Sequence, residues 1–317
     1  MKKIVALTLA VLMLVSLAAC GGSGSGKYTI GICQLVQHPA LDAATQGFQD
    51  ALTKALGEDK VAFDVQNASG EPTNCTTIVN KFVSSKVDLI MANATPALQA
   101  AVQATKDIPV LGTSVTEYGV ALGIDNFSGT VGTNISGTSD LAPLSEQAAM
   151  IPELCPDAKT VGIVYCSAEA NSQYQVDTVQ AELEKLGLTC TQYPFSDTND
   201  MASVTQSAVD NSDVVYVPTD NTCANNAGII DNIARPAGVP IIAGEEGICG
   251  GCGVATLSIS YYDLGVATGK MAAKVLTGEA DIASMPIEYA PQFTKKYNET
   301  ICTDLGLTVP EGYEAIA

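Results

Sequence analysis

The sequence predicts an α/β protein made of two Rossmann-like lobes, each built on a parallel sheet, joined by a multi-strand hinge. Three observations predict this class. The chain has 317 residues, enough for about two domains of roughly 150 residues each. Short β-rich runs alternate with helical patterns, and this alternation restarts near residue 135. Hydrophobic residues make up 47% of the chain and charged residues only 15%, which excludes a disordered protein.

The first half of the chain predicts one α/β lobe. Its β-rich runs are bounded by turn residues, and its helical patterns begin at or near prolines. The expected strands are 28–35, 61–67, 87–92 and 109–113, and the expected helices are 39–56, 72–85 and 96–105. Such βαβ alternation predicts a parallel sheet with helices on both faces.

After residues 135–138 the same alternation begins again. The expected strands are 160–165, 188–193, 214–217 and 240–243, and the expected helices are 141–151, 172–186, 201–209 and 223–233. This second series predicts a second lobe of similar architecture.

The last segment predicts a hinge. Residues 253–259 and 286–290 are strand-like, and 262–276 is an amphipathic helix. These elements are too few for a third domain, so we expect them to complete the existing sheets. The expected division is 27–135 plus 260–285 for lobe one, and 136–259 plus 286–317 for lobe two. A chain that crosses between lobes several times makes a hinge.

The first residues predict export and anchoring. Lys2 and Lys3 precede an apolar run, which ends in the lipobox-like sequence Leu17-Ala18-Ala19-Cys20. We expect a signal peptide at 1–19, a lipidated Cys20, and a flexible Gly/Ser tether at 20–26. An ordinary signal peptide cut nearby and an N-terminal membrane anchor are the alternatives. The mature protein is therefore expected on the outer face of the cell membrane.

Charge and reactive residues exclude several functions. Lys and Arg number 15 against 34 Asp and Glu, for a net charge of -19, so the chain lacks the basic surface that nucleic acid requires. A hydrolase is disfavoured because His38 is the single histidine and no G-x-S-x-G element occurs. Nine cysteines follow Cys20; Cys249 and Cys252 form a CxxC pair without a second ligand pair. We expect no enzyme activity, cofactor or metal, and the sequence leaves cysteine pairing open.

Polar residues gather just after the predicted strands, where open α/β sheets bind ligands. Hydroxyls, amides and carboxylates dominate there, with few cations. The candidate ligand-binding residues are Gln34, His38, Pro39, Leu41, Asp42, Thr95, Ser114, Val115, Thr116, Tyr118, Ser167, Glu169, Asn171, Ser172, Asp220, Asn221 and Glu245.

These loops suit a zwitterion. Thr95, Ser114 and Thr116 would hold a carboxylate with hydroxyls and helix N-termini. Asp220, with Glu245 as its rival, would accept hydrogen bonds from an ammonium group across the cleft. For any one residue, an ordinary helix N-cap is an equally good interpretation.

Several motifs resemble one known family. They are residues 32–44 followed by Gly-Phe at 47–48, Asn-Ala-Thr-Pro-Ala at 93–97, Gly-Thr-Ser-Val-Thr at 112–116, Asp-Asn-Phe-Ser-Gly-Thr at 125–130, Glu-Ala-Asn-Ser at 169–172 and Pro-Thr-Asp-Asn-Thr at 218–222. Together they resemble TrpX-type substrate-binding proteins of ABC transporters over essentially the whole mature chain. Cys249–Cys252 is a departure from that pattern.

The resemblance implies a type I periplasmic-binding-protein fold. It also implies an extracytoplasmic binding lipoprotein that captures a small amino acid, often aromatic, for a membrane permease. We expect a monomer. A sugar- or nucleoside-binding protein and a ligand-binding module of a sensory system are the alternatives. The sequence does not decide among tryptophan, tyrosine, phenylalanine and aliphatic ligands.

Overall fold

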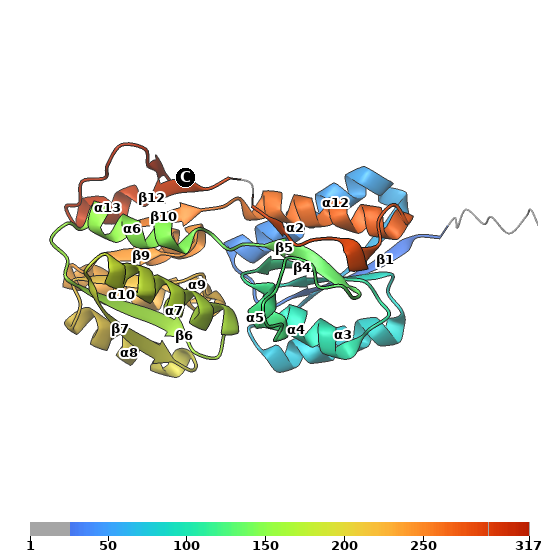
Figure 1. Cartoon of the computed structure of the whole chain (residues 1–317), viewed down its shortest axis with the longest axis horizontal. Coiled ribbons are helices and arrows are strands. Elements are labelled where there is room, and N and C mark those ends of the chain that lie inside the picture. Colours follow the sequence, from blue (N-terminus) through green and yellow to red (C-terminus); the bar gives the residue numbers. More distant parts are fainter. Residues whose placement is uncertain (1–25, 291, 317) are drawn as a thin grey trace, which may run out of the picture.

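The computed structural model describes residues 26–290 and 292–316. The expected signal peptide and Cys20 lie outside the described residues. Two α/β lobes lie side by side, and each contains one sheet flanked by helices (Figure 1).

The first sheet has six described strands in the order β11-β5-β4-β3-β1-β2. Their pairings are parallel. The strands are β1 (Tyr28–Gln34), β2 (Val61–Asn67), β3 (Leu89–Asn93), β4 (Val110–Val115), β5 (Ile135–Ser139) and β11 (Glu288–Tyr289).

Helices cover both faces of this sheet. The helices of lobe one are α2 (Pro39–Leu56), α3 (Pro72–Ser85), α4 (Thr95–Ala104), α5 (Tyr118–Leu122) and α12 (Tyr261–Thr277), with short 3-10 turns at Glu58–Lys60 and Ile282–Ser284. One face packs Phe48 and Met271 from α2 and α12 against the sheet. The other face packs Phe82 and Leu98 from α3 and α4.

Helices α2 and α12 lie unusually close because glycines face the partner backbone. A Cβ atom on Gly265 would lie 2.0 Å from the Ala44 carbonyl oxygen, and one on Gly47 would lie 2.1 Å from that of Tyr262. Both distances are far below van der Waals contact. The two helices therefore pack as one layer, and the first turn of α12 is held beside α2.

The second sheet has seven described strands in the order β13-β12-β10-β9-β8-β6-β7. Its strands are β6 (Thr160–Cys166), β7 (Thr189–Phe195), β8 (Val214–Val217), β9 (Ile241–Ala243), β10 (Ala255–Ser258), β12 (Thr294–Tyr297) and β13 (Glu314–Ala315). The pairing of β10 with β12 is antiparallel. The sheet is therefore mixed at its C-terminal edge, where the sequence predicted only parallel strands.

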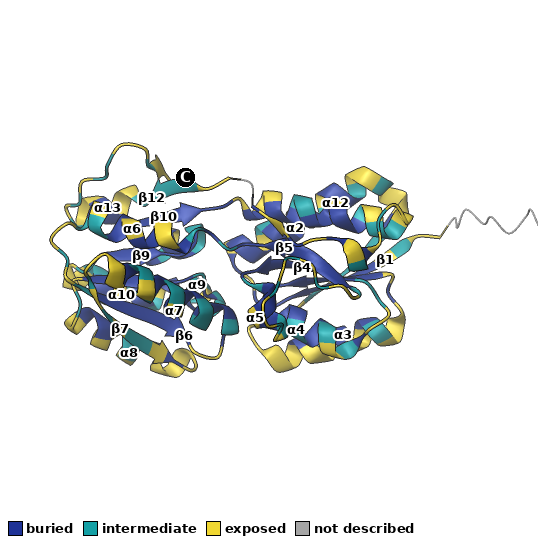
Figure 2. Ribbon diagram, in the orientation of Figure 1, coloured by how far each residue is buried: buried dark blue, intermediate teal, exposed yellow. Residues whose placement is uncertain are grey.

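Lobe two has its own helices and core. The helices are α6 (Leu144–Leu154), α7 (Ala170–Lys185), α8 (Thr198–Asp210), α9 (Asn221–Asn225), α10 (Ala227–Ala237), α11 (Glu246–Cys252) and α13 (Glu299–Asp304). The expected helix 223–233 is two helices, because Asn226 leaves helical geometry with φ -127° and ψ 23°. Figure 2 shows the central strands of both lobes buried beneath half-exposed helices, whereas the edge strands are partly exposed.

The described residues cross between the lobes at 140–143 and at 259–260, and the chain crosses a third time between β11 and β12, which belong to different sheets. The sheets to which β5 and β11 belong differ from the lobe boundaries that the sequence predicts. Residues 136–139 pair with β4, so β5 belongs to the first sheet instead of starting lobe two. Strand β11 then pairs with β5 before the last crossing. This pairing covers the outer backbone edge of β5 at Thr138 and Ser139, which would otherwise remain open.

Candidate ligand-binding cleft between the lobes

The ends of strands from both lobes meet at a small cavity, here called the cleft cavity. It is lined by His38, Leu41, Ser114, Thr116, Asp140, Asn171, Thr219, Asp220, Asn221, Ala224, Glu245 and Tyr261. Its volume is about 10 Å³, which is room for about one water molecule. An amino acid therefore enters this cavity only when the lobes move apart.

A histidine bridges the lobes across this cavity. The Nε2 atom of His38 lies 3.4 Å from Oδ1 of Asn221. Asn221 donates through Nδ2 to Glu169 at 2.7 Å, which assigns its Oδ1 as the acceptor. Burial lowers the pKa of His38, although Asn221 and Glu169 offset part of this effect. The imidazole is therefore neutral, Nε2 carries the proton, and Nδ1 is an acceptor.

The cleft cavity contains buried polar atoms that have no hydrogen-bond partner. In the described part of the chain these include Nδ1 of His38, Oγ of Ser114, Oδ1 of Asp140 and Oδ1 of Asn171. Three of these atoms are acceptors and the fourth is a hydroxyl. No Lys or Arg is among the described lining residues. Because a buried unpaired polar atom costs about 1–3 kcal/mol, the cavity is suited to a ligand that brings several donors.

Most acidic groups of the cleft are already paired. Asp220 caps α9 by accepting from the Cys223 N–H at 2.8 Å, and it also accepts from the Cys166 N–H and the Ser172 hydroxyl, each at 2.7 Å. Glu245 caps α11 by accepting from the Gly247 and Ile248 N–H groups. Burial raises the pKa of both carboxyls to about 7.

Strand ends near the cleft hold strained backbone. Ser114 at the end of β4 has φ 53°, and Ala94 after β3 has φ 89°. Residues other than glycine rarely adopt a positive φ, and such backbone strain is concentrated at functional sites. At Ser114 the strained residue also carries one of the unpaired atoms of the cleft cavity.

The structure separates the expected site residues into two groups. Those lining the cleft cavity are His38, Leu41, Ser114, Thr116, Asn171, Asp220, Asn221 and Glu245. Those outside its lining are Gln34, Pro39, Asp42, Thr95, Val115, Tyr118, Ser167, Glu169 and Ser172.

Several residues of the second group have structural partners. Tyr118 is fully buried in the core of lobe one and donates to the Thr138 carbonyl at 3.1 Å. Glu169 accepts from Asn221 and Thr222 and so holds the wall of the cavity. Gln34 donates to Asp42 at 2.7 Å.

The lining also contains residues that were not expected: Asp140, Thr219, Ala224 and Tyr261. Asp140 was missed because lobe two was expected to begin at residue 136, whereas β5 belongs to the first sheet.

A second cavity, here called the hinge-face cavity, lies beside the crossing segments and has a volume of about 770 Å³. It is lined by Pro39, Ala40, Ala43, Glu245, Glu246, Gly247, Gly250, Gly251, Ser258, Ile259, Ser260, Tyr261, Tyr262, Asp263, Ala290, Gln292, Thr294, Lys296 and Ile316. Glu245 and Tyr261 line both cavities and form part of a shared wall.

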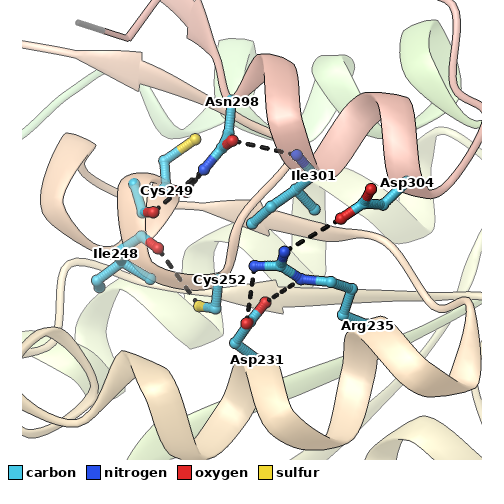
Figure 3. Close-up of polar contacts among 9 residues, drawn as sticks. Asp231, Arg235, Ile248, Cys249, Cys252, Asn298, Ile301 and Asp304 are labelled. Carbon is cyan, nitrogen blue, oxygen red and sulfur yellow. Dashed lines mark hydrogen bonds and ion pairs between the residues drawn. The ribbon is translucent and has the colours of Figure 1, made fainter.

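The CxxC pair belongs to helix α11 (Figure 3). The Cys252 thiol donates to the Ile248 carbonyl at 3.3 Å, and the backbone of Cys249 accepts from Asn298 at 3.2 Å. Burial raises the pKa of both thiols. The described residues contain no group of three or more His, Cys, Asp or Glu able to hold a metal. The Cys252 bond lies within α11, and the Asn298 bond fastens α11 to the C-terminal segment.

The neighbouring arginine has a similar role. Arg235 pairs with Asp231 at 2.7 Å on its own helix and with Asp304 of α13 at 3.1 Å (Figure 3). It therefore ties α10 to the C-terminal helix, away from the lining of the cleft cavity.

Two α/β lobes, three crossings in the described chain and a polar cavity between the lobes define a two-lobed ligand-binding protein. Residues 29–317 match the family model described as ABC transporter substrate binding protein, and the chain belongs to this family. Its members are extracytoplasmic, non-catalytic components of transport systems. The chain is therefore a transport receptor with a membrane permease as partner, and not an enzyme. No helix in the described ranges has the length and apolar character needed to cross a bilayer.

Relatives support this assignment. The chain is 38% identical over 260 residues to a tyrosine-binding protein of Clostridioides difficile, covering 81% of this chain and 75% of the relative. A Streptococcus pneumoniae ABC domain solved in complex with L-Trp is 34% identical, covers 92% of this chain and 100% of its own, and superposes with a TM-score of 0.87.

The arrangement of the lobes resembles that of the L-Trp complex. A ligand-free, open substrate-binding protein of Clostridium difficile is 38% identical and covers 91% of this chain and 99% of its own, yet its TM-score is only 0.70. The more similar sequence therefore gives the poorer superposition.

Proposed function

We propose that this chain captures an aromatic amino acid outside the cytoplasm and delivers it to an ABC importer. The observation that carries this proposal is the set of unpaired buried polar atoms in the cleft cavity, three of them acceptors. An ammonium group has three N–H donors, and a sugar or nucleoside has none that are charged. The tyrosine-binding relative and the L-Trp complex support an aromatic side chain.

The opposite end of such a ligand also has suitable partners. The Ser114 hydroxyl is unpaired. Helix α2 begins with Pro39, and its N-cap residue His38 makes no side-chain capping bond. The first-turn N–H groups of α2 are therefore available, and helix N-termini favour anions. We propose that the carboxylate binds at this end of the cavity.

A ligand screen tests this function. The protein without its anchor would be heated with L-tyrosine, L-tryptophan, L-phenylalanine, the other amino acids, sugars and nucleosides. A ligand at 100 times its Kd should add about 2.7 kcal/mol of stability. We expect aromatic amino acids to give the largest shifts and titration calorimetry to confirm one site. Stabilisation by sugars or nucleosides alone would overturn the proposal.

The lipid anchor and the monomeric state are part of the same proposal. Cys20 follows Leu17-Ala18-Ala19 in the printed sequence, and it lies outside the described residues. The Cys20→Ser variant should leave the membrane fraction for the soluble fraction, whereas retention would refute anchoring at Cys20. Light scattering of the tether-free protein should give the mass of one chain.

A further inference from the structure

One acidic residue of the cleft cavity differs from the others in its pairing. Both oxygens of Asp220 and both oxygens of Glu245 accept from backbone N–H groups or a hydroxyl. Asp140 accepts through Oδ2 from the Tyr261 hydroxyl at 3.0 Å, while its Oδ1 has no partner. Asp140 is only 5% exposed. It is therefore the acid of the cleft cavity with an oxygen that accepts no hydrogen bond.

The place of Asp140 in the fold explains why one oxygen is held and the other is free. It directly follows β5, at the start of the first crossing. Tyr261 is the first residue of α12, just after the second crossing. The hydrogen bond between them ties two crossing segments together at the base of the cleft. It also sets the orientation of the carboxyl group.

The surroundings of Asp140 provide no basic partner. The described lining of the cleft cavity contains neither Lys nor Arg. Burial raises the pKa of Asp140. The Tyr261 hydrogen bond offsets part of this effect, and so does the nearby Thr116 hydroxyl, which is not within hydrogen-bond geometry of Oδ1. An ionised buried carboxylate without a countercharge is costly, whereas pairing with a cation stabilises it. The missing countercharge is therefore one that a ligand would bring.

We propose that Asp140 receives the ammonium group of the bound amino acid, and that Tyr261 is the positioning residue that holds its carboxyl. This inference rests on the proposed function, because it requires an amino-acid ligand. It replaces the expectation from sequence that Asp220 or Glu245 has this role. Because Asp140 and Tyr261 flank the crossings, the ligand's charge is recognised at the pivot of the two lobes.

A cycle of protein and ligand changes tests the inference. The probes are L-tyrosine, L-tryptophan and their analogues without the amino group, 3-(4-hydroxyphenyl)propanoate and indole-3-propanoate. Losing one partner of a desolvated charged pair should weaken binding by ~100-fold or more. We expect the parent to bind each analogue ~100-fold more weakly than the corresponding amino acid. The Asp140→Asn variant should bind the amino acid ~100-fold more weakly than the parent does, whereas its affinity for the analogue should stay close to the parent's.

Matched variants separate recognition from folding. Asp50 of α2 accepts from the Tyr262 hydroxyl at 2.9 Å, so this exposed Asp–Tyr pair joins α2 to the first turn of α12. Asp50→Asn should bind both probes like the parent. Tyr261→Phe should weaken amino-acid binding several-fold but leave analogue binding unchanged. If Asp140→Asn does not fold, this selective effect of Tyr261→Phe is the deciding measurement.

The outcomes are distinguishable. A parent that binds no aromatic amino acid removes the proposed function and the inference with it. A parent that binds L-tyrosine or L-tryptophan, with Asp140→Asn binding them equally well, overturns the inference alone. Equal losses for amino acid and analogue in both the Asp140 and Tyr261 variants would show a purely structural role and would also overturn it.

Discussion

The cleft cavity and the hinge-face cavity share Glu245 and Tyr261 as a wall, yet they differ in size and in chemistry. The hinge-face cavity measures about 770 Å³ and the cleft cavity about 10 Å³. In the larger cavity Lys296 contacts Glu246 at 2.7 Å, and the Ser258 hydroxyl donates to the same carboxylate. None of the unpaired buried side-chain atoms in the described residues belongs to its lining.

The difference shows that unsatisfied polar atoms indicate a ligand site better than volume does. A cavity whose charged groups already have partners gains little binding free energy from a polar ligand. The small cavity has unpaired acceptors. Hydrogen bonds from a ligand that supplies donors can therefore offset the free energy needed to separate the lobes. The larger cavity therefore lies at the hinge, whereas the unpaired hydrogen-bonding atoms lie in the cleft.

The largest expected difference between the cavities comes from filling each with a phenyl ring. Ala224→Phe places a ring where the cleft has almost no free space, so it should obstruct closure and weaken aromatic amino-acid binding by ~100-fold or more. Ala43→Phe places the same ring in the larger cavity, where it fits. That variant should bind within about tenfold of the parent. Titration calorimetry of both variants measures the contrast, and equal losses would contradict it.

A smaller effect is expected from the pH dependence of the shared wall. Burial raises the pKa of Glu245 from 4.5 to about 7 in the folded protein. The folded state then binds a proton that the unfolded state lacks between these values, so stability should fall as pH rises from about 4.5 to 7. Glu245→Gln removes this contribution and should flatten the profile by ~1–3 kcal/mol.

Urea unfolding of ligand-free parent and variant between pH 5 and 8 measures that slope. His38 acts in the opposite direction, because burial lowers its pKa and stability is lost as pH falls through its ordinary range. His38 and Asp220 are present in both proteins, so the difference between the profiles isolates Glu245. If the parent and the Glu245→Gln variant gave parallel profiles of stability against pH, Glu245 would not be a buried neutral acid.

The smallest effect is expected at the ion pair of the hinge-face cavity. Lys296 and Glu246 have partly exposed side chains, at 27% and 33%, and such pairs contribute about 0–1 kcal/mol. Lys296→Gln should change the free energy of unfolding by no more than that and leave the Kd for L-tyrosine unchanged. A loss of affinity beyond tenfold would instead make the hinge-face cavity part of the ligand site.

Local sequence signals were sufficient for many elements. Helices α2 and α3 have the expected limits because proline begins each first turn, and Gly57 follows α2. Strands β2 and β8 also match the expected ranges. In contrast, β12, β13 and α13 were not predicted. The two strands are short edge elements whose stability comes from pairing with distant residues.

Sheet membership shows the same limit more clearly. Residues 135–138 were recognised as a point of change, but their pairing with β4 keeps them in the first sheet. The return of β11 to β5 joins residues about 150 positions apart, as the Ser136 hydroxyl bond to the Pro286 carbonyl illustrates. No local pattern contains such a contact.

The sequence by itself determined the two-lobed α/β class, the family and the kinds of side chain at the strand ends, because these depend on periodicity, capping residues and short motifs. It placed Asp220 and Glu245 correctly beside the cleft cavity but did not determine what they bind. Only the tertiary structure decided that both carboxyls cap helices while Asp140 retains an unpaired oxygen. The physical reason is that hydrogen-bond satisfaction depends on partners from several elements, and Asp140 meets Tyr261 only after the chain has crossed between the lobes.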